Sequence, residues 1–481
     1  MPTASSIAVL PGYEAQLVEK GVTHSVAKLN AAASALRDRL ARSTSDQSFE
    51  IHEAPCSRED ATLSYRCRVT FQLLCGAHGD GTWEYAMRTN REAVSIGCSY
   101  FPIASKRIQE TQTKLLHLFN GGGRDENFAN DFTTLLSARP ASISFASSWA
   151  DDKDIAVTIN YTDQLPKESS DGERKWLSDA DKVRRLCKLT SLTGRSRKRK
   201  LVSHDDNDMV EGSIMIRDTV TICCNETDKS VIDDVIIGNR QPAHEDDIAI
   251  RYEKPEDAFQ HPNGNACKMA LKWILNRISL ISNGSDHDVG LLEMYCGCGA
   301  HTVPIAKVCT QIAYIACVEI DERLIMACQK NLQSNQIDAE FRAPSEGIKA
   351  KTRSGGPVVQ LFRGDAGEWA TRSRHQMLSK KKDEENCSNT NTWYGRDYAV
   401  LLVDPPRAGL SANVCRMAIE GNFQHLIYIS CGKEALLRDI EMLNGTFQIA
   451  DCTLIDLSPE QMLWKVSCIC KGESLPSLAR F

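Results

Sequence analysis

The sequence predicts an α/β protein with a doubly wound, mostly parallel sheet in residues 256–481, preceded by an α+β domain in residues 1–255. From about Glu256, short apolar runs alternate with helical or loop segments, which is the pattern of parallel strands joined by crossover helices. Before that point, strand-like alternation such as that of residues 67–73 is more frequent. At 481 residues the chain is also too long for one ordinary core, which favours two domains.

The first half is expected to contain helices and several strands. Apolar residues recur at helical spacing in residues 12–42 and 105–118. Residues 65–95 predict a β-hairpin, because two strand-like runs flank the glycine-rich segment Gly76–Gly81. Further strands are expected at 142–145, 155–161 and 213–223.

The second half contains the apolar runs that predict the parallel sheet. Most of them are separated by segments of helical or loop character, so each strand is followed by a crossover. The expected strands are 288–295, 312–319, 358–363, 398–403 and 426–430.

Composition narrows the class of protein. A hydrophobic share of 42% and a charged share of 25% are typical of soluble globular chains. No run reaches the roughly 18 apolar residues that span a bilayer, and the N-terminus lacks the features of a signal peptide. We therefore expect an intracellular protein without membrane contact, in the cytoplasm, with the nucleus or mitochondrion as open alternatives.

The 19 cysteines are expected to be reduced thiols, because disulfide frameworks belong to secreted chains. Their spacings, such as Cys296-x-Cys298 and Cys468-x-Cys470, do not form a zinc or iron–sulfur ligand pattern, so no metal is expected. The net charge of −6 gives no global signal for nucleic acid, although a local basic face would be sufficient.

Two charged segments leave alternatives open. Gly194–Lys200 is a basic run that resembles a nuclear localisation signal, but it also fits a solvated loop or an RNA-facing strand or hairpin. The second run, Lys380–Glu385, lies in a polar insertion at 374–397 and is expected to be solvated. The sequence assigns no role to this insertion.

A glycine-bearing turn follows the first expected strand of the parallel sheet. Leu291–Gly299 has the sequence Leu-Leu-Glu-Met-Tyr-Cys-Gly-Cys-Gly, in which glycine lets the backbone approach a ligand closely. Glu319 ends the next strand, about 20 residues after Gly299, which is the usual position of the carboxylate that binds a ribose in nucleotide-type cofactors. The alternative is an ordinary strand-to-helix turn.

Two further strand ends carry reactive groups. Asp404-Pro-Pro-Arg-Ala-Gly-Leu410 follows one apolar strand, and its prolines fix a loop that presents the Asp404 carboxylate toward a planar polar group such as a nucleobase edge. Cys431 ends the next strand and precedes a helix, whose N-terminal N–H groups are expected to favour thiolate over thiol. The alternatives are a structural turn and a buried apolar cysteine.

These three motifs, Glu-x-Tyr-Cys-Gly-x-Gly, Asp-Pro-Pro-Arg-x-Gly-Leu and Tyr-Ile-Ser-Cys, resemble those of the RNA uracil-5-methyltransferases. Segments such as Tyr100–Ser105 and Phe259–Asn263 are similar to the TrmA-type branch, which acts on tRNA, so the resemblance covers nearly the whole chain. It implies a Rossmann-like class I methyltransferase domain after an RNA-binding domain, with S-adenosyl-L-methionine as cofactor and 5-methyluridine in the T-loop of tRNA as product. We expect a monomer.

The resemblance also assigns roles to residues. Cys431 would add to carbon 6 of uracil and activate carbon 5, and a base would then remove the carbon-5 proton. Asp404 and Arg407 would bind the substrate base, which must be extruded from its stack. The positions assigned to the cofactor are Tyr295, Gly297, Gly299, Glu319, Gln260, His261 and Asp365.

Two positions depart from the family. His261 stands where the family has a glutamine, although Gln260 is adjacent. Lys465 aligns with the glutamate that acts as base, and a lysine acts as a base only if burial lowers its pKa. Glu460 or water is therefore the expected base. The alternatives are an RNA-binding homologue with slow or lost turnover and an enzyme for another RNA or uridine.

Overall fold

The computed structural model describes residues 34, 50–51, 64–76, 81–88, 93–95, 101–121, 132–150, 154–205, 209–210, 213–238, 245–258, 261–285, 289–342, 356–373, 398–421, 423–458 and 461–470. Apart from Ser34, the helix expected at 12–42 lies outside this set. The described residues divide into two compact units. The first unit holds those within Pro55–Asp218 and Lys254–Asn265, and the second holds those within Val26–Ala54, Thr219–Glu253 and Ala266–Phe481. Residues 219–253 therefore group with the second unit, whereas the sequence-based boundary lies at residue 255.

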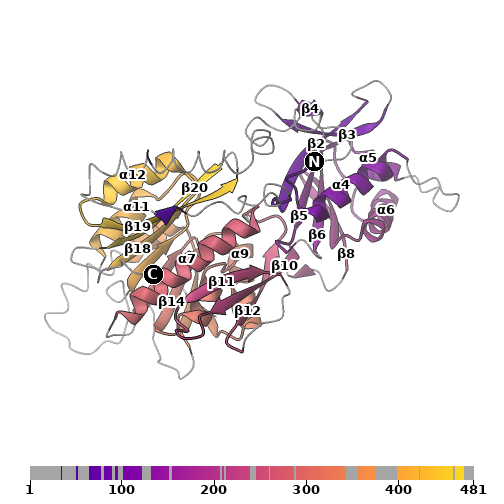
Figure 1. Cartoon of the computed structure of the whole chain (residues 1–481). Helices are drawn as coiled ribbons and strands as arrows, with labels where there is room; N and C mark the ends of the chain where they lie inside the picture. Colours follow the sequence, from indigo (N-terminus) through magenta and orange to yellow (C-terminus); the bar gives the residue numbers. More distant parts are fainter. Residues whose placement is uncertain are drawn as a thin grey trace. The chain divides into compact units, whose positions relative to one another are not determined.

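The first unit contains a sheet of seven described strands in the order β4-β3-β2-β5-β6-β7-β8 (Figure 1). Neighbouring strands are antiparallel except β6 and β7, which run parallel and are joined through helix α6. The strands are β2 (Arg68–Cys75), β3 (Trp83–Arg88), β4 (Ala93–Ser95), β5 (Pro140–Ser147), β6 (Ile155–Tyr161), β7 (Ser191–Ser196) and β8 (Arg199–His204). The hairpin expected at 65–95 is confirmed as β2 and β3. The basic run at 194–200 forms the β7–β8 hairpin.

The described helices of this unit are α4 (Lys106–Phe119), α5 (Thr133–Leu136) and α6 (Asp171–Cys187). Helix α4 confirms the helix expected at 105–118, whereas α6 was missed. The signals for α6 are nevertheless local, because the Ser170 hydroxyl accepts a hydrogen bond from the N–H of Glu173 and the Glu173 carboxylate accepts one from the N–H of Ser169. At its C-terminus, Lys188 adopts a left-handed conformation with φ 53°.

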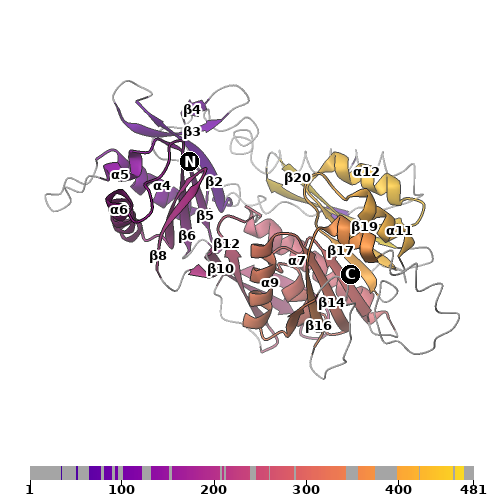
Figure 2. The same ribbon diagram turned by 180° about the vertical axis from the view of Figure 1, so that it is seen from behind.

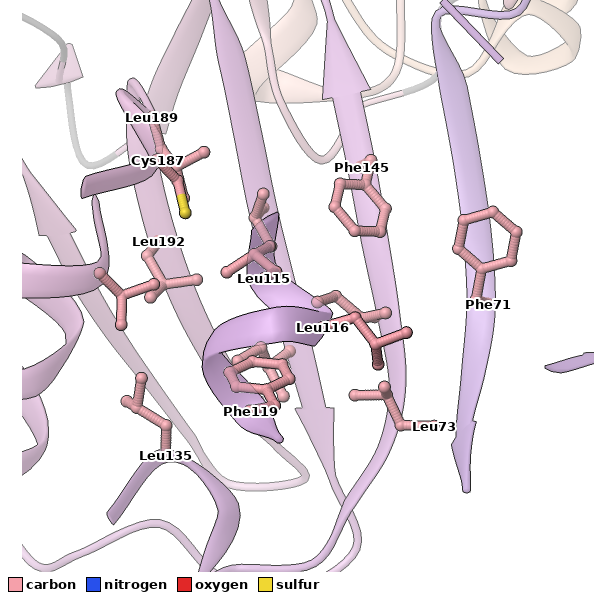
Figure 3. Close-up of a cluster of buried hydrophobic side chains, with 14 of the residues drawn as sticks. Phe71, Leu73, Leu115, Leu116, Phe119, Leu135, Phe145, Cys187, Leu189 and Leu192 are labelled. Atoms are coloured by element: carbon pink, nitrogen blue, oxygen red, sulfur yellow. The ribbon is translucent and has the colours of Figure 1, made fainter. Parts of the chain in front are cut away.

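Apolar side chains of the sheet and of all three helices form the core of the first unit. Figure 3 shows Phe71, Leu73, Phe145 and Leu192 of the strands facing Leu115 and Phe119 of α4, with Leu135 and Cys187 beside them. The rings of Phe71 and Tyr85 lie 5.1 Å apart between centroids. Burying one face of a sheet under helices in this way is a common α+β solution.

A smaller sheet follows in the chain. Its strands are β9 (Met209–Val210), β10 (Ser213–Cys224), β11 (Ile232–Ile237) and β12 (Ile248–Pro255). They are ordered β11-β10-β12, with β9 also paired to β10. The division between the two units falls within β10 and β12.

The second unit contains a sheet of nine described strands in the order β1-β19-β20-β18-β17-β13-β14-β16-β15. The strands are β1 (Glu50–Ile51), β13 (Val289–Met294), β14 (Ile312–Glu319), β15 (Ala339–Phe341), β16 (Val358–Arg363), β17 (Tyr398–Val403), β18 (His425–Ser430), β19 (Gln448–Ser458) and β20 (Gln461–Cys470). All pairs from β15 to β18 are parallel, and β20 is antiparallel to both of its neighbours. The predicted doubly wound, mostly parallel sheet is confirmed.

Strand β13 is the switch point of this sheet, because the chain proceeds from it to β14 and β16 on one side and then crosses to β17 on the other. The connecting helices are α7 (Gly264–Asn283), α8 (Thr302–Val308), α9 (Glu322–Ser334), a helix at 366–373, α11 (Ala412–Glu420) and α12 (Lys433–Leu443). Helix α11 packs beside α12 (Figures 1 and 2). Ligands of open α/β sheets bind at the C-terminal strand ends beside such a switch point.

Within the described part of the chain, no helix combines the length and the apolar character needed to cross a bilayer.

Candidate functional site

Three neighbouring strands end at the same edge of the second unit's sheet. The Cα of Met294 in β13 pairs with Val403 in β17, and Val403 pairs with Tyr428 in β18. The turns that follow these strands carry the glycine motif, Asp404 and Cys431, in that order across the sheet. Adjacent strands lie about 4.8 Å apart, so the three turns are neighbours.

The turn after β13 has an unusual backbone. Tyr295, Gly297 and Gly299 adopt left-handed conformations with φ of 63°, 57° and 83°. The N–H groups of Tyr295 and Cys296 both donate to the carbonyl of Val318, at 2.9 and 3.2 Å, which ties the turn to β14. A tyrosine with positive φ is strained, so the surrounding structure must fix it there.

The two glycines have different tasks. A Cβ placed on Gly297 would meet no atom within 4 Å, so this backbone faces open space that a ligand can occupy. A Cβ on Gly299 would lie 2.8 Å from the sulfur of Cys328, so Gly299 allows the turn to pack against α9.

Glu319 is buried at the end of β14, and both of its oxygens hold backbone groups. One oxygen accepts from the N–H of Gly297 at 3.0 Å, and the other accepts from the N–H of Asp321 at 2.9 Å. Each carboxylate oxygen has a second lone pair that remains for a ligand hydroxyl. Glu319 therefore shapes the glycine turn as well as offering acceptors to a ribose.

A second buried carboxylate lies under the same turn. Glu293 of β13 accepts a hydrogen bond from the hydroxyl of Thr302 at 2.6 Å. Its other oxygen, Oε1, lies 3.5 Å from Nδ1 of His301 and has no hydrogen-bond partner among the described residues. Buried polar atoms are nearly always paired, whereas this oxygen is an acceptor that the described part of the chain leaves unsatisfied beneath the turn.

Tyr295 and Asp365 lie close together at this edge. Burial raises the pKa of Tyr295 to about 12, and the negative charge of Asp365 adds to the effect. The Asp365 carboxylate also accepts from the N–H of Glu368 at 2.9 Å, which caps the helix at 366–373. The structure thus brings Tyr295, Gly297, Glu319 and Asp365 together, and their acceptors and open space fit a cofactor with ribose hydroxyls.

The remaining cofactor positions are Gln260 and His261. Gln260 lies outside the described residues. His261 belongs to the first unit, where its carbonyl accepts from the indole N–H of Trp149 at 3.0 Å and its Nδ1 accepts from the N–H of Asn263 at 3.2 Å. These contacts fix the segment within the first unit, and the role of His261 toward the cofactor remains a prediction.

The loop from Asp404 to Leu410 lies directly against the Cys431 turn. Gly432 packs against the backbone of Arg407, where any Cβ would collide with the Arg407 carbonyl. The Ser430 hydroxyl accepts from the N–H of Gly432 at 3.1 Å, which stabilises the turn that exposes Cys431. Asp404 and Arg407, predicted from a separate motif, therefore lie beside the predicted nucleophile.

Cys431 is half-buried and packs against the apolar cluster of Ala266, Ala270 and Ile455. Burial raises the pKa of its thiol, the Asp404 charge raises it further, and the Arg407 guanidinium lowers it through its charge and a hydrogen bond. A backbone hydrogen bond at this helix start also lowers the pKa, in the expected direction, but burial and the Asp404 carboxylate outweigh it, so the pKa of the thiol is raised in the protein alone. Among the described residues, Arg407 is the side chain that favours the thiolate.

Glu460 and Lys465 are the residues that the sequence offers as base. Glu460 lies outside the described residues. Lys465 lies in β20, where its Cα pairs with Ile429 of β18 and with Thr453 of β19. Its backbone thus runs alongside the strand that ends before Cys431.

One buried charge at the site was missed from the sequence. Asp439 of α12 is fully buried and accepts hydrogen bonds from Leu410 and Tyr428. The sequence feature that could have revealed Asp439 is its position in the apolar stripe of Leu436, Ile440 and Leu443, where a carboxylate is unexpected. No group of three His, Cys, Asp or Glu side chains in the described part of the chain could hold a metal ion.

Comparisons with known proteins identify the family. The family model for tRNA (uracil-5-)-methyltransferase matches residues 222–342 and 393–463. A tRNA/tmRNA (uracil-C(5))-methyltransferase from Azotobacter vinelandii is 30% identical over 396 residues, which cover 82% of this chain and 84% of the relative. The chain belongs to the tRNA (uracil-5-)-methyltransferase family. An enzyme of the same name from Ectopseudomonas mendocina is 26% identical over 396 residues, which again cover 82% of this chain and 84% of the relative.

The fold agrees with this family. The crystal structure of Pyrococcus abyssi tRNA (uracil-54, C5)-methyltransferase, in complex with S-adenosyl-L-homocysteine, superposes with a TM-score of 0.52 at 14% identity, covering 92% of this chain and 83% of that one. The predicted family, the enzyme class and the fold class are confirmed.

Proposed function

We propose that this protein methylates carbon 5 of uridine in the T-loop of tRNA through a covalent adduct of Cys431. The supporting observation is that Asp404 and Arg407 both act on the Cys431 thiol, next to a glycine turn that fits a cofactor. The turn of Asp404 lies between the other two turns, because β17 lies between β13 and β18. A uracil ring held by Asp404 would therefore have Cys431 on one side and the cofactor turn on the other.

The chemistry follows from the electronic structure of uracil. Carbon 5 is a weak nucleophile, so the Cys431 thiolate forms a bond to carbon 6 and the electron pair of the carbon 5–carbon 6 π bond moves onto carbon 5. S-adenosyl-L-methionine supplies the methyl group that carbon 5 takes up, and leaves as S-adenosyl-L-homocysteine. A base then removes the proton from carbon 5, the double bond forms again and the thiolate of Cys431 leaves.

Asp404 and Arg407 have complementary tasks in this scheme. A carboxylate only accepts hydrogen bonds, and the one donor on the ring edge of uracil is the N3–H group, so Asp404 binds that edge. The contact partly neutralises the charge of Asp404, which otherwise raises the pKa of the Cys431 thiol. Arg407 donates to the sulfur and stabilises the thiolate as the thiol proton passes to solvent.

The elimination step needs a base other than the family's glutamate. Lys465 stands at that position in β20 and is a poor base at neutral pH unless its pKa is lowered. Glu460 or water is therefore the proposed base. Since the carbon-5 proton must leave before Cys431 is released, this step is expected to limit turnover.

The first unit is the proposed RNA-binding domain. Arg195 pairs with Asp257 at 2.9 Å, and the guanidinium of Arg68 donates to the carbonyl of Ala258, so both are held by the protein. Arg197 and Lys198 form the exposed two-residue turn of the β7–β8 hairpin, where no described residue pairs with them. These two cations are the proposed contacts to tRNA phosphates.

The test is methyl transfer from labelled S-adenosyl-L-methionine to a T-arm RNA. Many methyl groups per protein, lost in Cys431→Ala and retained in Cys75→Ala, would support the proposal. Cys75 is a suitable control because it is an exposed cysteine of the first unit. Transfer by Cys431→Ala at the wild-type rate would refute the role of Cys431. A single methyl per protein, trapped as an adduct, would identify a homologue stalled at elimination, and activity on ribosomal RNA fragments alone would identify another substrate.

A further inference from the structure

The loop of Asp404 and the turn of Cys431 are joined through one buried carboxylate. Asp439 lies on α12, the helix that begins after Cys431, and its side chain is fully buried. Its Oδ2 accepts from the backbone N–H of Leu410 at 2.7 Å and from the hydroxyl of Tyr428 at 2.7 Å. Leu410 ends the loop of Asp404, and Tyr428 precedes Cys431 on β18. Asp439 therefore holds both segments at once.

The charge of Asp439 is balanced locally. Its Oδ1 accepts from Nε and Nη2 of Arg438 at 2.9 and 2.6 Å, and the same guanidinium donates to the carbonyl of Ala408 at 2.8 Å. Arg438 thus bonds to the loop as well as to the carboxylate. A buried carboxylate persists only where such donors satisfy it, and here the donors come from three separate segments.

Two glycines allow the loop to pack closely against α12 and the Cys431 turn. A Cβ on Gly409 would collide with Oδ2 of Asp439, and Gly432 lies against the backbone of Arg407. The loop is therefore fixed at β17, at the Gly432–Arg407 contact and at the Asp439–Leu410 hydrogen bond. Among these, the Asp439 hydrogen bond is the one that a single isosteric substitution can weaken.

We propose that Asp439 is a positioning residue. It fixes the Asp404–Leu410 loop against the Cys431 turn, so that Asp404 and Arg407 keep one position relative to the thiol and to the uracil ring. Asp439 does not touch the reacting atoms in this arrangement. This inference rests on the proposed function. It extends that function by assigning a role to a residue that the three sequence motifs do not contain.

The test compares Asp439→Asn and Tyr428→Phe with Glu441→Gln. Asparagine keeps the shape of Asp439 but has one acceptor oxygen for the donors of three segments, and Tyr428→Phe removes one donor only. Glu441→Gln makes the same charge change on an exposed position of α12. The measurements are kcat and KM for a T-arm RNA, the Kd of S-adenosyl-L-homocysteine, and the pH profile of Cys431 alkylation.

Asp439→Asn should lower kcat by about 10- to 100-fold, as expected when the support of a reacting group is loosened. The Kd of S-adenosyl-L-homocysteine should stay within about twofold, because the glycine turn is held by Glu319 and Val318 instead. The alkylation profile of Cys431 should shift along the pH axis as Arg407 and Asp404 move relative to the sulfur. Tyr428→Phe should show the same changes at smaller size, and Glu441→Gln should match wild type.

Unchanged kcat and an unchanged alkylation profile in a folded Asp439→Asn protein would overturn the proposal. If Asp439→Asn does not fold, Tyr428→Phe decides in the same way. Failure of the proposed function itself would look different, because wild-type protein would then form no 5-methyluridine in the T-arm RNA. The alkylation measurement needs no RNA, so it still tests the positioning by Asp439 in that case.

Discussion

The carboxylate of Glu319 accepts a hydrogen bond from the backbone N–H of Gly297 at 3.0 Å, so the end of β14 determines the shape of the turn after β13. Its other oxygen holds the N–H of Asp321 at the start of α9. The residue that would bind a ribose is thus also the residue that preorganises the backbone around it. Removing one acceptor oxygen of Glu319 should therefore weaken cofactor binding in two ways, because the ribose loses a contact and the turn loses part of its support.

Glu319→Gln tests this relationship. The glutamine amide keeps one acceptor oxygen, so one of the two backbone N–H groups loses its partner, at a cost of about 1 to 3 kcal/mol. We expect the Kd of S-adenosyl-L-homocysteine to rise by about tenfold or more by calorimetry. Glu322→Gln is the control, because Glu322 is exposed and pairs with Arg363 on the surface. Equal Kd values for the two variants would contradict the assignment.

The reactivity of Cys431 should depend on pH in a specific direction. Burial and Asp404 raise the pKa of this thiol above its usual 9, so the thiol is protonated at neutral pH and alkylation by iodoacetamide should accelerate as the pH rises. Asp404→Asn removes a negative charge, lowers the pKa and should speed alkylation at pH 8. Arg407→Ala removes a positive charge, raises the pKa and should slow it.

Mass spectrometry of the Cys431 peptide measures these rates. The peptide of exposed Cys75 in the same digest is an internal reference for reagent and pH. If Asp404→Asn and Arg407→Ala changed the Cys431 rate in the same direction, the electrostatic account of the site would fail.

How much the sequence could predict depended on whether the signal was local. The strand ends that carry Asp404 and Cys431, and the acidic end of β14, were predictable because apolar runs and turns are local patterns. The raised pKa of Cys431 was not, because it depends on Asp404 and on burial against Ala266 and Ala270, which lie far away in the sequence. Asp439 was missed because its donors come from Leu410 and Tyr428 in other segments.

A buried ion pair in the first unit should dominate the stability of its region. Lys254 donates to Asp218 at 2.8 Å, and its ammonium lies over the ring of Trp149. Both charged side chains are almost completely buried, so Lys254→Met leaves the Asp218 carboxylate without its cation and should cost about 3 to 5 kcal/mol. Urea unfolding followed by tryptophan fluorescence should show a clearly lower midpoint.

Arg174→Met is the matched control for this stability measurement. Arg174 forms an ion pair with Asp171 on α6 in the same unit, but both side chains are exposed. Surface pairs contribute little, so its unfolding midpoint should stay close to that of wild type. Midpoints that fell equally in Arg174→Met and Lys254→Met would contradict a special role for the buried pair.

The β7–β8 turn should contribute to RNA affinity through phosphate contacts. Arg197→Ala combined with Lys198→Ala removes two exposed cations, so we expect weaker T-arm binding at low salt and a salt dependence of log K that is shallower by about 1 to 2. The matched control is Arg174→Ala with Lys175→Ala, which removes the same charge from exposed positions on α6. Titration of fluorescent T-arm RNA at several salt concentrations measures both slopes. If the turn contacts phosphate, the salt slope should change only in the double variant of the turn. Equal changes in both double variants would mean that the RNA responds to net charge, and the turn would then not belong to the proposed RNA interface.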